Sequence, residues 1–315
     1  MSTRALPVSR GFGVFCVLAA SVLWGTTGTA ATFAPDVSPL AIGAAAMGIG
    51  GLLQMLLAFR QIKGDGSLLH SHWAFVLIGA IAVAIYPLAF YTSMHLAGVT
   101  IGTVVTIGSA PLLSAVIERV FDGKQLTARW LVGACLGLLG TVLLCIAKAQ
   151  GHASSAVHVS LSASVFGVVL GLLAGATYAL YSWTAHRLMR KGVSSSAAMG
   201  ATFGLGGLML LPVLLLTGAS LVESWSNAAV GLYMILVPMF LGYILFGLGL
   251  SKVAASTATT LSLIEPVVAA VLAVVIVGER LPLLGWVGAA LIVGCLYFLV
   301  AQPEVQHEGT QAQRV

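Results

Sequence analysis

The sequence predicts an all-α integral membrane protein with ten transmembrane helices, arranged as two inverted five-helix repeats with both termini in the cytoplasm. Three observations lead to this fold class. First, 59% of the 315 residues are hydrophobic and only 7% are charged, whereas a soluble domain carries roughly 25% charged residues. Second, apolar stretches long enough to cross a bilayer follow one another along most of the chain. Third, the stretch 86–140 recurs in outline about 155 positions later.

Each spanning helix needs about 20 consecutive, mostly apolar residues, and the sequence contains ten such stretches. Short segments rich in glycine and charge separate them, for example 60–66 and 121–124. The weakest separation lies at 251–254, where a single lysine stands between two long apolar runs. The expected spans are 12–33, 38–59, 73–95, 100–120, 128–147, 163–185, 195–216, 227–250, 255–277 and 283–301.

The internal repeat is carried by residues that return at one fixed offset. Pro111 corresponds to Pro266, and the Gly-Lys-Gln-Leu turn at 123–126 corresponds to the Gly-Glu-Arg-Leu turn at 278–281. Each half holds five spans, which is an odd number. The second half must therefore enter the membrane from the opposite side, which is the arrangement of inverted repeats.

The positions of lysine and arginine predict the orientation in the membrane. With the N-terminus in the cytoplasm, the loops alternate so that twelve of the 14 lysines and arginines lie inside, and only Lys148 and Arg280 lie outside. This bias agrees with the positive-inside rule. The expected division is a first repeat at 1–150, a second repeat at 151–302 and a disordered polar cytoplasmic tail at 303–315.

Charge and motif content argue against several classes of protein. The net charge of +5 comes from short loops, so it indicates membrane orientation and no nucleic-acid partner. The four cysteines lie in apolar stretches without CxxC spacing, so we expect no metal and no other cofactor. The sequence has no Walker A motif, Ser/His/Asp arrangement or HExxH motif, and we therefore expect neither ATP drive within this chain nor an enzyme.

Glycines recur every four residues on several spans. Gly167, Gly171 and Gly175 follow this spacing in span six, and Gly133 and Gly137 follow it in span five. Small residues at this spacing let helix backbones approach closely in a bilayer, where no hydrophobic driving force holds helices together. The pattern predicts helix contacts, not a specific function.

Glu265 is the only carboxylate expected deep inside a span. An acidic residue at the centre of a transmembrane helix costs about 2.5–3.5 kcal/mol on insertion scales, so it usually faces a cavity or a partner. Two interpretations remain open. Glu265 is either a proton-coupling group or a partner for a substrate amine, or it forms a structural hydrogen bond to a neighbouring helix.

Polar residues precede a proline in two corresponding spans. Ser262 lies ahead of Pro266 in span nine, and Thr103 lies ahead of Pro111 in span four. This pattern predicts locally loosened helices that line a cavity. A plain proline kink is the alternative.

Aromatic residues gather on spans one, three, six and eight. Aromatic walls with a few polar groups suit small, partly apolar organic ligands. Packing or contact with lipid is the alternative for any single ring. The expected cavity aromatics are Trp24, Tyr86, Tyr91, Tyr178, Tyr181, Tyr243 and Phe246.

These features together resemble the EamA group of the drug/metabolite transporter superfamily over about residues 12–300. The resemblance rests on the ten spans, Trp24-Gly25, Pro111, Glu265-Pro266 and the turn 278–281. The first half departs from the family pattern, because Lys124 follows Gly123 where the family often has glutamate. The resemblance implies a carrier of the bacterial cytoplasmic membrane that commonly exports amino acids, with its cavity between the halves near spans 1, 3, 4, 6, 8 and 9.

The leading hypothesis is a secondary transporter that exports amino acids or related small metabolites by alternating access. Drug efflux or nucleotide-sugar exchange is the alternative, although no lysine or arginine lies mid-span to hold an anionic sugar nucleotide. A membrane-embedded enzyme is a remote alternative, because it would need several convergent reactive groups. The expected partners are a small-molecule substrate, the lipid bilayer and, if transport is uphill, protons. The oligomeric state is left open by the sequence.

Overall fold

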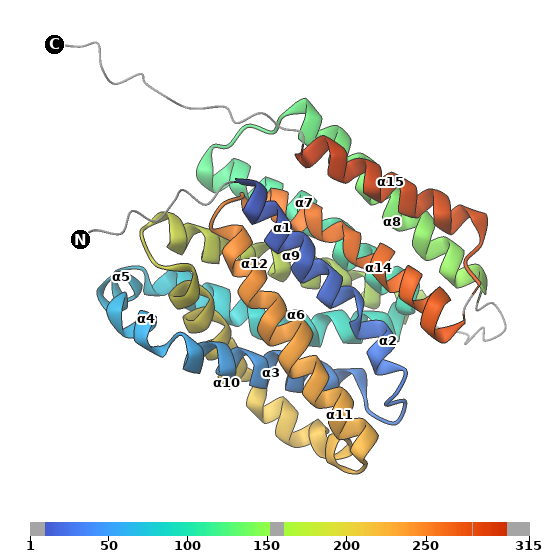
Figure 1. Cartoon of the computed structure of the whole chain (residues 1–315), viewed down its shortest axis with the longest axis horizontal. Helices are drawn as coiled ribbons and strands as arrows, with labels where there is room; N and C mark the ends of the chain where they lie inside the picture. Colours follow the sequence, from blue (N-terminus) through green and yellow to red (C-terminus); the bar gives the residue numbers. More distant parts are fainter. Residues whose placement is uncertain (1–9, 152–160, 279, 301–315) are drawn as a thin grey trace.

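The computed structural model describes residues 10–151, 161–278 and 280–300, and it is built from helices and connecting turns (Figure 1). Glu279 and the expected disordered tail at 303–315 lie outside the described residues. In chain order the elements are α1 Arg10–Gly25, α2 Thr27–Ala31, α3 Pro39–Leu57, α4 Phe59–Gly64, α5 Gly66–Ser71, α6 Trp73–Ala97, α7 Val99–Asp122, α8 Ala128–Gly151, α9 Leu161–Arg190, α10 Ser195–Thr217, η1 Gly218–Val222, α11 Trp225–Met234, η2 Ile235–Leu241, α12 Gly242–Leu250, α13 Ala255–Leu261, η3 Ser262–Ile264, α14 Glu265–Leu272, η4 Ala273–Val277 and α15 Leu283–Val300.

The helices confirm the predicted spans. Among the described residues, nine helical segments are long and apolar enough to cross a membrane, and α15 adds a shorter apolar helix. Large apolar side chains point outward along the bundle, as Phe15, Leu216 and Val275 do with 64%, 87% and 73% of their surface exposed. Such a surface suits lipid, and the helices satisfy their own backbone hydrogen bonds as the bilayer core requires.

Helices of one half pair with helices of the other half. α3 packs along α10, α8 along α15 and α6 along α9, and Figure 1 shows α8 and α15 side by side. α1 packs against α12. Since α1 corresponds to α9 and α12 corresponds to α6 in the repeat, this contact is the counterpart of the contact between α6 and α9. The same correspondence relates the contact of α7 with α9 to that of α14 with α1. The two repeats are therefore joined along a seam with internal pseudo-symmetry.

Glycines on α9 allow α6 and α7 to approach it closely. Ser93 Oγ on α6 donates a hydrogen bond to the Gly167 carbonyl at 2.7 Å. Thr106 Oγ1 on α7 donates to the Gly171 carbonyl at 3.1 Å. A Cβ atom at Gly175 would lie 2.8 Å from the Thr106 carbonyl oxygen. These contacts confirm that the four-residue glycine spacing marks a helix interface.

The crossing of α8 and α15 supports a stability prediction. A Cβ atom at Gly288 would lie 2.6 Å from the Gly140 carbonyl oxygen, and the reverse distance is also 2.6 Å. Gly288→Ala should lower the free energy of unfolding by about 1–3 kcal/mol, the usual cost of overpacking, because a backbone atom cannot rotate aside. Gly294→Ala on the same helix is the matched control, because no atom lies within 4 Å of its Cβ position. Thermal unfolding of the purified protein in detergent tests the pair, and equal melting temperatures would contradict the packing role of Gly288.

Three spans are interrupted inside the bundle. The first span breaks at Thr26, between α1 and α2, and the eighth contains the π-helical turn η2 around Pro238. The ninth contains the 3-10 turn η3 directly before Pro266, which confirms the loosening expected there. The matching expectation for span four is wrong, because α7 stays α-helical through Pro111.

At one end of the bundle, a buried carboxylate on α7 forms hydrogen bonds that link the two halves. Glu118 on α7 is 1% exposed. Its Oε2 accepts hydrogen bonds from Ser256 Oγ at 2.5 Å and from Lys124 Nζ at 2.9 Å. Its Oε1 accepts one from the Ser256 backbone N–H at 3.3 Å. A carboxylate here satisfies a free N–H group at the start of α13 and complements the positive end of that helix.

A second charged cluster lies at the same end. Arg187 Nε on α9 pairs with Asp122 Oδ1 at 2.9 Å, and Trp183 Nε1 donates to Asp122 Oδ2 at 2.8 Å. Arg10 at the start of α1 donates to the Leu299 carbonyl near the end of α15 at 3.5 Å. Basic residues of both halves therefore meet at one end of the bundle. The cytoplasmic location of that end remains a prediction from the positive-inside rule.

Candidate functional site

A cavity of about 50 Å³ lies inside the bundle, lined by both halves of the chain. α1, α2, α3 and α6 contribute from the first half, and α9, η2, α12 and α14 contribute from the second. Its aromatic lining consists of Trp24, Tyr86, Phe90, Tyr91, Tyr178, Tyr181 and Tyr243. The rest of its lining consists of Thr27, Gly43, Met47, Pro87, Met239 and Glu265.

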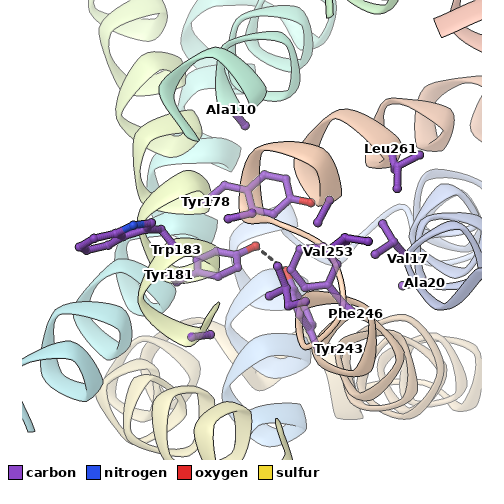
Figure 2. Close-up of a cluster of buried hydrophobic side chains, with 14 of the residues drawn as sticks. Val17, Ala20, Ala110, Tyr178, Tyr181, Trp183, Tyr243, Phe246, Val253 and Leu261 are labelled. Atoms are coloured by element: carbon purple, nitrogen blue, oxygen red, sulfur yellow. Dashed lines mark hydrogen bonds between the residues drawn. The ribbon is translucent and has the colours of Figure 1, made fainter. Parts of the chain in front are cut away.

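The aromatic rings pack against one another in a continuous cluster around the cavity. Figure 2 shows Tyr178 and Tyr181 on α9 beside Tyr243 and Phe246 on α12. The rings of Tyr178 and Tyr181 stack with centroids 5.3 Å apart. Trp24 on α1 contacts Tyr243 at 4.8 Å and Phe246 at 5.1 Å between centroids. Edge and offset contacts of this kind fix ring positions, so the wall is held largely by the rings themselves.

Hydrogen bonds hold several polar tips of these rings. Trp24 Nε1 donates to the carbonyl oxygen of Pro238 at 2.9 Å, inside the π-helical turn η2. The hydroxyls of Tyr181 and Tyr243 bond to each other at 2.9 Å. Tyr178 Oη donates to Ser262 Oγ at 2.9 Å. The broken segments of spans eight and nine therefore supply the partners for the aromatic wall, as interrupted helices do when they line a cavity.

Glu265 is placed at the cavity by the break in span nine. It is the first residue of α14, and Pro266 directly after it has no N–H group to continue the helical hydrogen bonds of η3. The end of α1 lies against this point, because a Cβ atom at Gly25 would be 2.9 Å from the Glu265 carbonyl oxygen. The interruptions of spans one and nine therefore meet at the backbone of Glu265.

The Glu265 carboxylate lies at the cavity and has no hydrogen-bonding partner among the described residues. Within residues 10–151, 161–278 and 280–300, it makes no side-chain hydrogen bond and no ion pair. No lysine, arginine or histidine from the described part of the chain lines the cavity. Glu265 is therefore the one carboxyl group that the described lining presents to a guest molecule.

The structure brings together most, but not all, of the residues predicted for a cavity. Phe246 and Ser262 do not line it directly, but they support it through the ring of Trp24 and the hydroxyl of Tyr178. Pro266 is buried behind Glu265. Those that line the cavity are Trp24, Tyr86, Tyr91, Tyr178, Tyr181, Tyr243 and Glu265.

Two predicted residues on span four lie away from this cavity. Thr103 Oγ1 donates to Met94 Sδ at 3.5 Å and so joins α7 to α6. Pro111 is buried in the unbroken helix α7. Neither residue is in the lining of this cavity, and α7 packs on α9 and α13 instead, so their role in substrate binding stays a prediction.

The sequence did not indicate the contribution of α3. Gly43 and Met47 line the cavity from this helix. A Cβ atom at Gly43 would overlap the ring of Tyr91, so a glycine is needed for that ring to lie where it does. The composition of α3 gave no signal of this role, because small and apolar residues are also what a packing helix requires.

Comparison with known proteins agrees with this architecture. The EamA-like transporter family matches residues 11–146 and again residues 165–301. The uncharacterized transporter YwfM of Bacillus subtilis (strain 168) is 33% identical over 92% of this chain and 94% of its own length. A probable terminal-alkyne amino-acid exporter of Streptantibioticus cattleyicolor is 24% identical over 68% of each chain. A solved crystal structure with 22% identity has a TM-score of 0.73 and covers 92% of this chain and 96% of its own, which shows a shared fold.

These matches define a class of function. The protein is a multi-pass membrane protein of the bacterial inner membrane, and it transports a small molecule across the lipid bilayer. The double match of the family and the relationship to YwfM cover nearly the whole chain. The chain therefore belongs to the EamA-like transporter family.

Proposed function

We propose that this protein is a secondary carrier that exports amino acids or related amine-bearing metabolites by alternating access. The observation that carries the proposal is the Glu265 carboxylate, which faces a cavity of aromatic rings between the two repeats. A carboxylate is the natural partner of a substrate ammonium group, because charge-assisted hydrogen bonds are roughly twice as strong as neutral ones. The aromatic rings suit the apolar part of the same molecule.

The size of the cavity supports a cycle of conformations. Its volume of about 50 Å³ is far below the roughly 300–1,000 Å³ of typical ligand sites. A metabolite can be accommodated only if the helices around the cavity separate. The interruptions in spans one, eight and nine give the lining helices points at which to bend, and the two repeats then move relative to one another around the site.

Glu265 is also the proposed site of proton coupling when export runs uphill. Export down a tenfold gradient already releases about 1.4 kcal/mol, so coupling is needed only against a gradient. A proton and a substrate ammonium group would compete for the same carboxylate. The ammonium group would neutralise the carboxylate during the export step, and the proton would neutralise it during the return step. The other titratable groups of the described lining are tyrosines, so Glu265 is the natural carrier of this proton.

A relative adds independent support for the amine-bearing substrate. The Streptantibioticus cattleyicolor protein is described as a probable exporter of a terminal-alkyne amino acid, and it aligns over 68% of this chain. Drug efflux is the second candidate, because the aromatic lining also suits apolar drugs. Nucleotide-sugar exchange has less support, since the described lining offers no basic side chain to a phosphate. We propose no enzymatic reaction, because the titratable groups of the described lining are Glu265 and tyrosines, with no histidine, lysine or cysteine among them.

A metabolite-export screen tests this proposal. Cells that produce the protein should release one or more amino acids or amines faster than cells without it, and they should resist toxic amino-acid analogues. Purified protein in liposomes should move the same compounds. If a broad panel of amino acids, amines and analogues shows no change in efflux or resistance, the proposal is wrong, and efflux of uncharged drugs becomes the leading function.

A further inference from the structure

The described lining of the cavity contains an acidic side chain and no basic side chain. Glu265 contributes a carboxylate, and no lysine, arginine or histidine lines the cavity within the described chain. A zwitterionic amino acid brings a carboxylate of its own together with its ammonium group. A buried charge without a partner is strongly unfavourable, so the second charge of a zwitterion has no ionic partner in this cavity.

Neutral hydrogen-bond donors compensate only weakly for this lack. The hydroxyls of Tyr178, Tyr181 and Tyr243 are already used in hydrogen bonds with Ser262 or with each other. Among the lining tyrosines, only Tyr86 and Tyr91 have hydroxyls that form no hydrogen bond with another described residue. Two phenols can donate to a substrate carboxylate, but they do not neutralise it.

The aromatic faces favour a positive charge. Trp24, Tyr86, Tyr91 and Tyr178 border the same cavity as Glu265. The face of an aromatic ring attracts a cation that lies within about 6 Å of the ring centroid. Cages of aromatic rings are used in proteins to recognise ammonium groups. Burial strengthens this attraction because water does not screen it.

We propose that the cavity selects singly charged cationic amines, meaning compounds that carry an ammonium group and no carboxylate, over zwitterionic amino acids. Decarboxylated amino acids, amino-acid amides and esters, and quaternary ammonium compounds belong to this class. The inference rests on the proposed function, because it assigns the charge of the molecule that the same site exports. Glu265 holds the positive charge, and the aromatic rings surround the rest of the ammonium head.

Ligands that share one phenyl group separate the effects of charge. Phenethylamine and its N,N,N-trimethyl derivative are cations, phenylalanine is a zwitterion and hydrocinnamate is an anion. Their dissociation constants for the purified protein and their fluxes in proteoliposomes should be measured at neutral pH. We expect both cations to bind at least about tenfold more tightly than phenylalanine, with hydrocinnamate the weakest, because an unpaired buried carboxylate is penalised.

Variants of Tyr86 test the part played by the aromatic faces. Tyr86→Phe keeps the ring and removes the hydroxyl, so the preference for cations should survive. Tyr86→Leu removes the ring, so the affinity for the trimethyl derivative should fall by several fold. Tyr297→Leu is the control, because Tyr297 lies on the outer surface and is 73% exposed. Melting temperatures show whether each variant is folded, and Tyr91→Leu, which removes another ring of the lining, gives the same test if Tyr86→Leu does not fold.

The outcomes distinguish this inference from the proposed function. Equal affinity for phenylalanine and phenethylamine, or tighter binding of phenylalanine, would overturn the cation preference and leave amino-acid export intact. Failure of every amine and amino acid to bind or cross the membrane would overturn both proposals.

Discussion

Replacing Glu265 by glutamine is expected to slow net export by about tenfold to a hundredfold while the protein stays folded. A hydrogen bond to a charged group contributes about 1.5–3 kcal/mol, and each 1.4 kcal/mol changes an equilibrium tenfold. Glutamine keeps the shape of the side chain and can still accept a hydrogen bond, but it attracts neither a proton nor an ammonium group by charge. Its neutral amide is also easier to bury than a carboxylate.

Transport assays in proteoliposomes separate the roles of this residue. Pumping driven by a pH gradient and counterflow of substrate between equal pH values should be measured on wild type and Glu265→Gln. Loss of pumping with intact counterflow identifies proton coupling, whereas loss of both with weaker substrate binding identifies the ammonium partner. Glu223→Gln is the matched control, because Glu223 is an exposed carboxylate that follows η1. An unfolded Glu265→Gln protein would instead point to a structural role, and unchanged activity would contradict every proposed role.

The second large effect is expected at Glu118, where the two halves are joined. Glu118→Ala removes the acceptor of the Ser256 hydroxyl and backbone N–H groups, and Ser256 is 1% exposed. Leaving buried donors without a partner costs about 1–3 kcal/mol. Lys124→Ala should cost about 1 kcal/mol or less, because 40% of the lysine side chain is exposed and water screens such pairs.

Thermal or chemical unfolding of the purified variants measures this difference. Glu118→Ala should melt at a clearly lower temperature than Lys124→Ala, and Glu118→Gln should fall between Glu118→Ala and wild type because it keeps one acceptor. A double variant of Glu118 and Lys124 should be no less stable than Glu118→Ala alone. Equal destabilisation by the two alanine variants would show that the ion pair, not the contact with α13, holds this end together.

The sequence alone was sufficient for the membrane fold. Spanning helices require long apolar runs, and helices that meet in lipid require small residues at their contacts, so both leave patterns along the chain. The rule that a charge in the bilayer faces a cavity or a partner singled out Glu265 before its surroundings were known. The aromatic residues on spans one, three, six and eight also stand out in the sequence, since aromatic walls with a few polar groups are typical of ligand sites.

The tertiary structure decided which of these residues meet. Pro111 and Pro266 correspond in the repeat, yet α7 stays continuous while span nine breaks before α14. The proline pattern is alike in the two spans, so the pattern by itself does not distinguish them. Gly43 and Met47 were missed for the same reason, because small and apolar residues are expected everywhere in a membrane bundle. The sequence therefore determined the number of spans, the duplication and the buried charge, whereas only the packed structure decided that Glu265 faces aromatic rings without a basic partner among the described residues.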